Sequence, residues 1–314
     1  MIYVDNINEF KEKIKEQRFK NKKLLFVFGD SWTNNTYLFN NGTYPKKSWA
    51  YQLAEKFGYD IVVNLSTDGG SNNDIFEWCL KTMCLFDEYE FEKCRINELE
   101  TAEIKVIIGW SSQIRNFDST TKIFRPWNVT SIPYTLGMNK ESQYYKLYND
   151  YIVNLHPEYY CYSTQLQTIC LQHYFKHHKI DSYYFMAFTP LIENEIIDTK
   201  WDLRNQIDKN NFYKLDKIES MADTISSITQ SDIKNEYVFD QPFLVENINS
   251  FYKTILNKKD NFVNFLENKF INSKKDNTYF MSDGHPNELG LEVMANELFE
   301  LIKNDQQTKS GKES

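Results

Sequence analysis

The chain has no long hydrophobic run and no cysteine framework. None of its 314 residues belongs to an apolar stretch of about 18, the length that a membrane-spanning helix needs, and the N-terminus has no apolar signal-peptide core. The five cysteines are odd in number and include no Cys-x-x-Cys pair, which is typical of reduced thiols rather than disulfides. We therefore expect a cytoplasmic protein without a membrane partner; a virion-associated phage protein would have the same features.

The chain also lacks a basic stripe and a cofactor motif. It carries 36 Lys and Arg against 44 Asp and Glu, so its formal net charge is −8 and we expect no nucleic-acid partner. No Gly-x-Gly-x-x-Gly follows the first predicted strand, so we expect no nucleotide cofactor. His173, His177 and His178 lie close together, but no Cys or carboxylate is spaced to complete a metal site.

What the sequence does contain is an alternation of apolar runs and amphipathic segments. Predicted strands lie at 24–28, 61–65, 105–109 and 183–188, and predicted helices at 5–17, 48–58, 72–94 and 286–302. Strands separated by helices are typical of βαβ units with right-handed connections and a mostly parallel sheet. The pattern predicts the α/β class, as a three-layer α/β/α sandwich.

The region before the last predicted helix breaks this alternation. Residues 191–275 are polar and poor in strand patterns, which indicates a helical insertion or cap. We expect residues 1–303 to form a single domain and the polar residues 304–314 to be a disordered tail.

Three short motifs lie at the ends of the predicted elements. The first, Gly29-Asp30-Ser31, follows the first strand, where open α/β sheets bind ligands. A serine at this place is a candidate nucleophile. Asp30 or Ser31 could instead simply cap the next helix.

The second motif follows the second strand, where Gly69-Gly70 leads into Ser71-Asn72. Glycines at this place let backbone N–H groups approach a developing oxyanion. The alternative is an ordinary glycine-containing turn that is capped by Asp68, Ser71 or Asn72.

The third motif contains Asp283 and His285 and directly precedes the last helix. Pro286 suits the first helical position, which would leave His285 at the cap. A histidine beside an aspartate can act as a general base that the carboxylate orients. The alternative is an ordinary helix N-terminus with an incidental histidine.

The order of these motifs resembles the SGNH, or GDSL-type, serine hydrolases. The resemblance extends from about Leu24 to Ile302 and depends on Gly-Asp-Ser, on Asn64 and Gly69, and on the Asp-His turn. The start Gly-Asp-Ser-Trp-Thr is also similar to that of SGNH-like proteins of bacteriophages.

This resemblance implies a flavodoxin-like sandwich that hydrolyses esters, often acetyl groups on carbohydrates. The substrate would be a small-molecule or carbohydrate ester, with no cofactor and no metal. The resemblance further implies that Ser31 is the nucleophile, His285 the base and Asp283 its orienting acid.

The chain departs from the family at two places. The third family block is usually Gly-x-Asn-Asp, whereas Ser111 stands here where the Asn would donate to the oxyanion. The expected oxyanion donors are therefore the backbone N–H groups of Ser31 and Gly69, with Asn72 or Ser111. Asp283 also lies two residues before His285 instead of three, as in a branch with alginate O-acetyltransferase-like proteins. An O-acetyltransferase and a binding module without turnover thus stay open as alternatives.

Three further side chains are candidates for contacts with the substrate. Trp32 directly follows the first motif, and Trp110 and Arg115 lie in or beside the segment that matches the third family block; all three could stack on a sugar or bind an acid group. The alternative is that the tryptophans pack in the core and Arg115 makes a surface ion pair. The sequence gives no indication of the oligomeric state.

Overall fold

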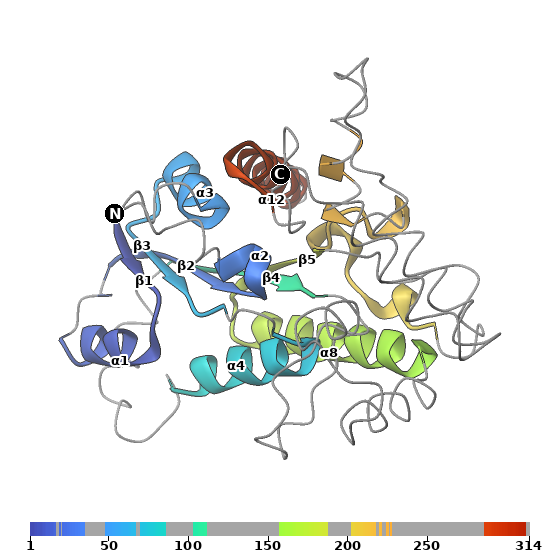
Figure 1. Ribbon diagram of the computed structural model, residues 1–314, viewed down its shortest axis with the longest axis horizontal. Helices are drawn as coiled ribbons and strands as arrows, with labels where there is room; N and C mark the ends of the chain where they lie inside the picture. The colour runs from blue at the N-terminus through green and yellow to red at the C-terminus, as the bar shows by residue number, and fades with distance from the viewer. Residues whose placement is uncertain are drawn as a thin grey trace, which may run out of the picture.

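A parallel sheet forms the centre of the computed structural model (Figure 1). The structure describes residues 1–16, 19, 21–34, 48–66, 70–85, 103–111, 157–187, 202–217, 220–221, 224–225, 227 and 286–311. The five strands of the sheet are β1 (Ile2–Val4), β2 (Lys23–Phe28), β3 (Ile61–Asn64), β4 (Glu103–Trp110) and β5 (Asp181–Met186). Their order is β1-β3-β2-β4-β5, and all neighbours pair in parallel.

The order β3-β2-β4-β5 is that of a flavodoxin-like sheet, to which β1 adds an edge strand beyond β3. The four predicted strands are confirmed to within a few residues. Strand β1 was not predicted, because three residues are too short for a period to be recognised. The chain proceeds from β2 to one side of the sheet and then returns to the other side, so the topological switch point lies between β2 and β4.

Helices cover both faces of the sheet and confirm the three-layer α/β/α sandwich. Helices α3 (Trp49–Phe57) and α12 (Glu288–Ser310) lie on one face, and α1 (Ile7–Lys15), α4 (Asn72–Leu85) and α8 (Pro157–His177) lie on the other (Figure 1). Successive side chains of a strand point to opposite faces. Leu24, Phe26 and Phe28 accordingly pack toward α1, α4 and α8, whereas Leu25 and Val27 pack toward α3 and α12.

The boundaries of α3 follow from its capping residues, as predicted. Ser48 is the N-cap, and its Oγ accepts a hydrogen bond from Tyr51 N at 3.1 Å. Gly58 ends the helix with a φ of 68°, a left-handed conformation that glycine adopts without steric strain.

Helix α12 continues past the predicted end at Ile302 to Ser310. The expectation of a disordered tail therefore does not hold for residues 304–310. Two distant contacts stabilise this part: Tyr183 Oη donates to Asp305 Oδ2 at 2.8 Å, and Lys309 Nζ lies 2.9 Å from Asp181 Oδ1.

The described part of the predicted insertion follows the outer edge of β5. It contains three 3₁₀ turns, η4 (Arg204–Gln206), η5 (Lys209–Asn211) and η6 (Leu215–Lys217), and Phe212 forms a parallel bridge with Tyr184. Most of residues 191–275 lies outside the described residues, so the helical insertion stays a prediction.

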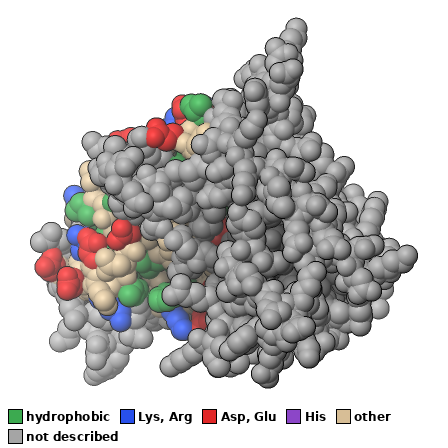
Figure 2. Space-filling view, in the orientation of Figure 1, with side chains coloured by type: hydrophobic (Ala, Val, Ile, Leu, Met, Phe, Trp, Pro, Cys, Tyr) green, Lys and Arg blue, Asp and Glu red, His purple; other side chains and the backbone are tan. Residues whose placement is uncertain are grey.

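Two features of the described part of the chain concern its surroundings: the character of its helices and the side chains on the face that Figure 2 shows. None of the helices that the structure describes has the length and apolar character to cross a bilayer. Where Figure 2 shows described side chains, acidic and basic groups are interspersed with apolar ones.

Candidate active site

Ser31 begins a short helix, α2 (Ser31–Asn34), directly after β2. Asp30 is fully buried and caps this helix: its Oδ1 accepts from Trp32 N at 3.0 Å, and its carbonyl oxygen accepts from Thr33 N at 3.0 Å. Ser31 is therefore the first helical residue, at the carboxyl end of β2 and beside the switch point. The side chain of Ser31 lies outside the described part of the structure.

Two glycines let the ends of β2 and β4 pack closely against α2. A Cβ on Gly29 would lie 2.3 Å from Thr33 Oγ1 and 3.1 Å from the carbonyl oxygen of Gly109. A Cβ on Gly109 would lie 2.5 Å from the ring of Phe185 and 3.0 Å from the same Thr33 oxygen. These glycines are required for space, so the turn that carries Ser31 is held tightly against β4.

Asn64 attaches α2 to the neighbouring strand β3. Its Nδ2 donates to the carbonyl oxygen of Thr33 at 2.9 Å and to Tyr3 Oη at 2.7 Å, while its Oδ1 accepts from Ser66 N at 3.2 Å. Because Asn64 is buried, each of these bonds would leave an unsatisfied group if it were lost. The amide thus fixes the position of α2 relative to the sheet.

The structure brings two predicted oxyanion donors, Asn72 and Ser111, into contact. Asn72 is buried at the start of α4, where its Oδ1 accepts from the backbone N of Ser111 at 2.7 Å and its Nδ2 donates to Thr164 Oγ1 at 3.0 Å. The backbone N–H of Ser111 is therefore already used. The second N–H of the Asn72 amide has no protein partner in the described part of the chain, so it can donate to a ligand.

The turn before α4 is capped by Ser71, one of the three residues considered from the sequence. Ser71 and Asp74 form a capping box in which Asp74 N donates to Ser71 Oγ at 3.2 Å and Ser71 N donates to Asp74 Oδ2 at 3.0 Å. With this cap in place, the side chain of Asn72 is available for its contacts with Ser111 and Thr164.

The two tryptophans considered as substrate contacts are both fully buried. Trp32 packs in the cluster under α3 and α12, and Trp110 packs in the cluster on the opposite face. A ring with 0% exposure offers no free face to a sugar, so the burial supports the alternative of core packing for both.

The first turn of α12 lies toward the carboxyl ends of the strands. Its last turns contact the start of β5 through Asp305 and Lys309, so the helix runs antiparallel to that strand. The helix is capped by Asn287, whose Oδ1 accepts from Leu289 N at 3.0 Å and from Gly290 N at 3.2 Å. The prediction that Pro286 is the first helical residue is therefore wrong: the helix begins two residues later, at Glu288, because the side-chain oxygen of Asn287 accepts from the free N–H groups of the first turn.

Four predicted site residues lie outside the described residues: Gly69, Arg115, Asp283 and His285. Their roles stay predictions. The sequence did not predict the contact of Asn64 with Thr33 or that of Thr164 with Asn72, although both support the site. A polar Asn64 at the end of an apolar strand was a usable signal, whereas Thr164 lies 92 residues from Asn72 and carried none.

Comparison with known proteins gives distant structural likenesses only. No protein-family model and no curated protein matches the chain. Among solved structures, the chain is similar to a member of the lipolytic protein G-D-S-L family from Veillonella parvula DSM 2008, with 14% identity, a TM-score of 0.33 and coverage of 90% of this chain and 98% of that one. It is also similar to the acetyl xylan esterase AlAXEase, with 9% identity, a TM-score of 0.32 and coverage of 89% and 99%. At these values neither likeness identifies a substrate or a catalytic residue.

Proposed function

We propose that this protein is a serine esterase of the SGNH type that removes acyl groups, acetyl above all, from a carbohydrate or a small ester. The observation that supports it most is the position of the Gly-Asp-Ser motif. Ser31 begins α2 at the carboxyl end of β2, beside the switch point between β2 and β4. Open α/β sheets bind their ligands in the crevice at this point.

The direction of α12 supports His285 as the base. Pro286 lies at the end of α12 that is directed toward the carboxyl ends of the strands. His285 directly precedes Pro286 in the sequence, and this supports its assignment as the base at that end of the sheet. A serine hydroxyl is a weak nucleophile without an adjacent base, and a histidine here can supply one.

The proposed reaction is a two-step acyl transfer to water. His285, oriented by Asp283, takes the proton of Ser31 Oγ as this oxygen attacks the ester carbonyl. The alcohol then leaves with the proton from His285, and water releases the acyl group from Ser31 as the free acid. We assign the oxyanion to the N–H groups of Ser31 and Gly69 and to the second N–H of Asn72, which Ser111 and Thr164 hold in place.

A fluorophosphonate probe tests this assignment directly. We expect the full chain to form one adduct, located by mass spectrometry at Ser31, and we expect Ser31→Ala and His285→Ala to abolish it. Ser310→Ala, at the end of α12, is the matched control and should be labelled like the unchanged protein. A folded sample without an adduct, or an adduct that survives Ser31→Ala, would overturn the proposal.

The segment 109–112, which stands where the family has Gly-x-Asn-Asp, favours one alternative, a binding module of the same fold without turnover. This segment contains no Asn, and the backbone N of Ser111 already donates to Asn72, so the segment presents no side-chain amide to an oxyanion. Such a module would bind an acylated sugar with the same affinity before and after Ser31→Ala and would not release acetate. An O-acetyltransferase would instead release acetate more slowly than it transfers the group to an added sugar acceptor.

A further inference from the structure

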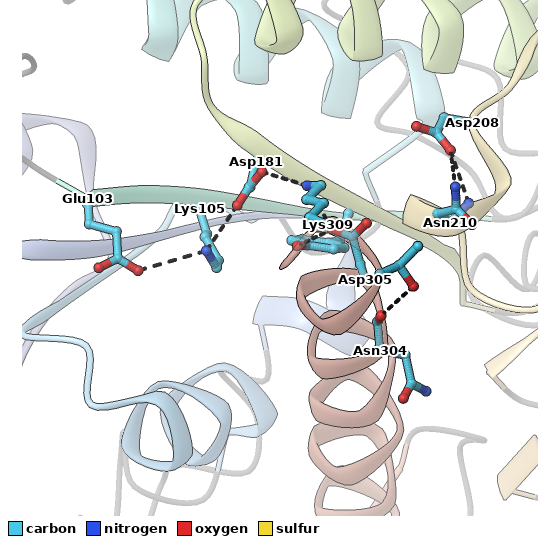
Figure 3. Close-up of polar contacts among 10 residues, drawn as sticks. Glu103, Lys105, Asp181, Asp208, Asn210, Asn304, Asp305 and Lys309 are labelled. Carbon is cyan, nitrogen blue, oxygen red and sulfur yellow. Dashed lines mark hydrogen bonds and ion pairs between the residues drawn. The ribbon is translucent and has the colours of Figure 1, made fainter. Parts of the chain in front are cut away.

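A cavity of about 640 Å³, lined mostly by residues with polar or charged side chains, lies at the amino end of β5, at the opposite end of the strands from Ser31. Its described walls are the last turns of α8, the first residues of β5, the turns η4 and η5, and Lys309 of α12. Figure 3 shows Asp208 and Asn210 on one side of this region and Asp181 and Lys309 on the other. The volume is within the range of small-ligand sites.

Two lysines in the wall have no carboxylate partner. Lys176 and Lys179 form no ion pair within the described part of the chain. The carboxylates of the wall have other partners. Asp181 lies 3.1 Å from Lys105 Nζ and 2.9 Å from Lys309 Nζ, and Asp208 Oδ1 accepts from the backbone N of Asn210 at 3.1 Å. The two ammonium groups are therefore available to an anion in the cavity.

Lys179 occupies a position where glycine is the usual residue. Helix α8 ends in a Schellman motif, in which Ile180 N donates to Phe175 O at 2.9 Å and Lys179 N donates to Lys176 O at 3.2 Å. In this motif the residue that follows the last helical residues, here Lys179, adopts a left-handed conformation. The φ of Lys179 is 55°. A lysine is strained there and a glycine would not be, so a substitution by glycine removes the side chain without disturbing the backbone.

Side-chain amides complete the wall. Gln172 joins α8 to the turn η5. The Oε1 of Gln172 accepts from Asp208 N at 2.9 Å, and its Nε2 donates to Asp208 O at 3.2 Å. Asn205 and Gln206 add two more amides. The Oδ1 of Asn211 is buried and has no hydrogen-bond partner, which is unfavourable unless a donor reaches it. A hydroxyl group on a ligand would be such a donor.

We propose that this cavity binds a phosphate monoester that carries hydroxyl groups, such as a sugar phosphate. Lys176 and Lys179 bind the phosphate dianion, and the amides of Asn205, Gln206 and Asn211 bind the hydroxyls. Two unpaired cations match a dianion, and the orphaned acceptor matches a hydroxyl donor. This site is separate from that of Ser31, so the two proposals stand or fall independently.

Titration calorimetry on the full chain at low ionic strength tests the site with three probes: glucose 6-phosphate, inorganic phosphate and glucose. We expect glucose 6-phosphate to bind most tightly, inorganic phosphate more weakly, and glucose not measurably. Lys179→Gly should raise the Kd for glucose 6-phosphate about tenfold, since one charge-assisted hydrogen bond is lost. Its melting temperature should equal or exceed that of the unchanged protein, because the strain at φ 55° is relieved.

Lys214→Gly is the matched control. Lys214 is also a left-handed lysine, with a φ of 49°, but it does not line the cavity and its Nζ donates to Thr224 Oγ1 at 2.8 Å. This variant should leave the Kd unchanged. Absence of binding, equal Kd values for inorganic phosphate and glucose 6-phosphate, or an equal effect of both lysine variants would each overturn the proposal.

Discussion

The carboxyl ends of the strands are joined by neutral side chains, whereas the amino ends are joined by charges. At the carboxyl ends, Asn64 bonds to Thr33 and Asn72 bonds to Ser111. At the amino ends, a chain of ion pairs extends from Glu103 through Lys105, Asp181 and Lys309 to Asp305 (Figure 3). Both ends are thus cross-linked, but among the described contacts only the cross-links at the amino ends are ion pairs.

This difference suits a site where charge develops during a reaction. Neutral amides can orient N–H groups toward an oxyanion without placing a permanent anion or cation beside it. The charged side chains at the amino ends stabilise the fold: Lys309 and Asp305 anchor the last turns of α12 to the start of β5. Since α12 is one continuous helix, this anchor also determines where its first turn lies.

The largest expected effect is on kcat, which a substitution at the carboxyl ends of the strands should lower far more than one at the amino ends. If Ser31 is the nucleophile, as proposed, Ser31→Ala should lower kcat for p-nitrophenyl acetate by at least about 10³-fold, while the melting temperature stays unchanged. Lys309→Met, at the other end, should lower the melting temperature and change kcat less than tenfold at 25 °C. An equal loss of activity in both variants would refute the claim that the carboxyl ends carry the reaction while the amino ends anchor α12.

The next effect is on stability at the charged end. Asp305→Ala should lower the free energy of unfolding by about 2–3 kcal/mol, because the buried Tyr183 hydroxyl loses its acceptor and Lys309 loses a partner. Urea unfolding at pH 7 measures this loss. Asp305→Asn is the control: it keeps an oxygen for Tyr183 and should lose only about 1 kcal/mol. Equal losses for both variants would show that the hydrogen bond to Tyr183 contributes nothing.

The fold was predictable where short-range chemistry decides the structure. The run from Leu24 to Phe28 is apolar at every position, and Ser48 and Gly58 are the residues that helix caps require. The prediction failed where distant contacts decide it. The end of α12 depends on Asp305 meeting Tyr183, which lies 122 residues away, and no local pattern reports such a contact.

The candidate site was predictable to a similar extent. The position of Ser31 after a buried strand follows from the order of strand, glycine and polar residues. The contact between Asn72 and Ser111 required the packing of α4 against the end of β4, which is a tertiary property. Tertiary packing also buries Trp32 under α3 and α12 and Trp110 on the opposite face, whereas the sequence left substrate contact and core packing both open for these two residues.

A smaller effect is the pH dependence that Asp181 contributes. Burial alone would raise the pKa of Asp181, but hydrogen bonds and ion pairs with Lys309 and Lys105 outweigh it and lower the pKa below its ordinary value of 3.8. A lowered folded-state pKa stabilises the protein fully above that ordinary value, and this stability is lost as the pH falls from about 4 through the folded-state pKa. The loss should be smaller than that of Asp305→Ala, since Asp181 is 39% exposed and solvent screens it.

Urea midpoints at pH 6 and pH 3 measure this contribution. Asp181→Asn has no carboxylate to protonate at this position, so its midpoint should fall less between the two pH values than that of the unchanged protein. An equal fall in both proteins would mean that other carboxylates account for the whole acid sensitivity.

The smallest effects concern two helix ends with opposite residue choices. Helix α3 ends at Gly58 with a φ of 68°, and α8 ends at Lys179 with a φ of 55°. A Cβ on Gly58 would contact nothing within 4 Å, so Gly58→Ala should lower the free energy of unfolding by about 1 kcal/mol through backbone strain alone. Lys179→Gly should raise the free energy of unfolding by about 0.5–1 kcal/mol, because glycine relieves the backbone strain at this position. Urea unfolding without phosphate compounds measures both, and a loss of stability in Lys179→Gly would show that the lysine stabilises the fold itself, by its charge at the end of α8.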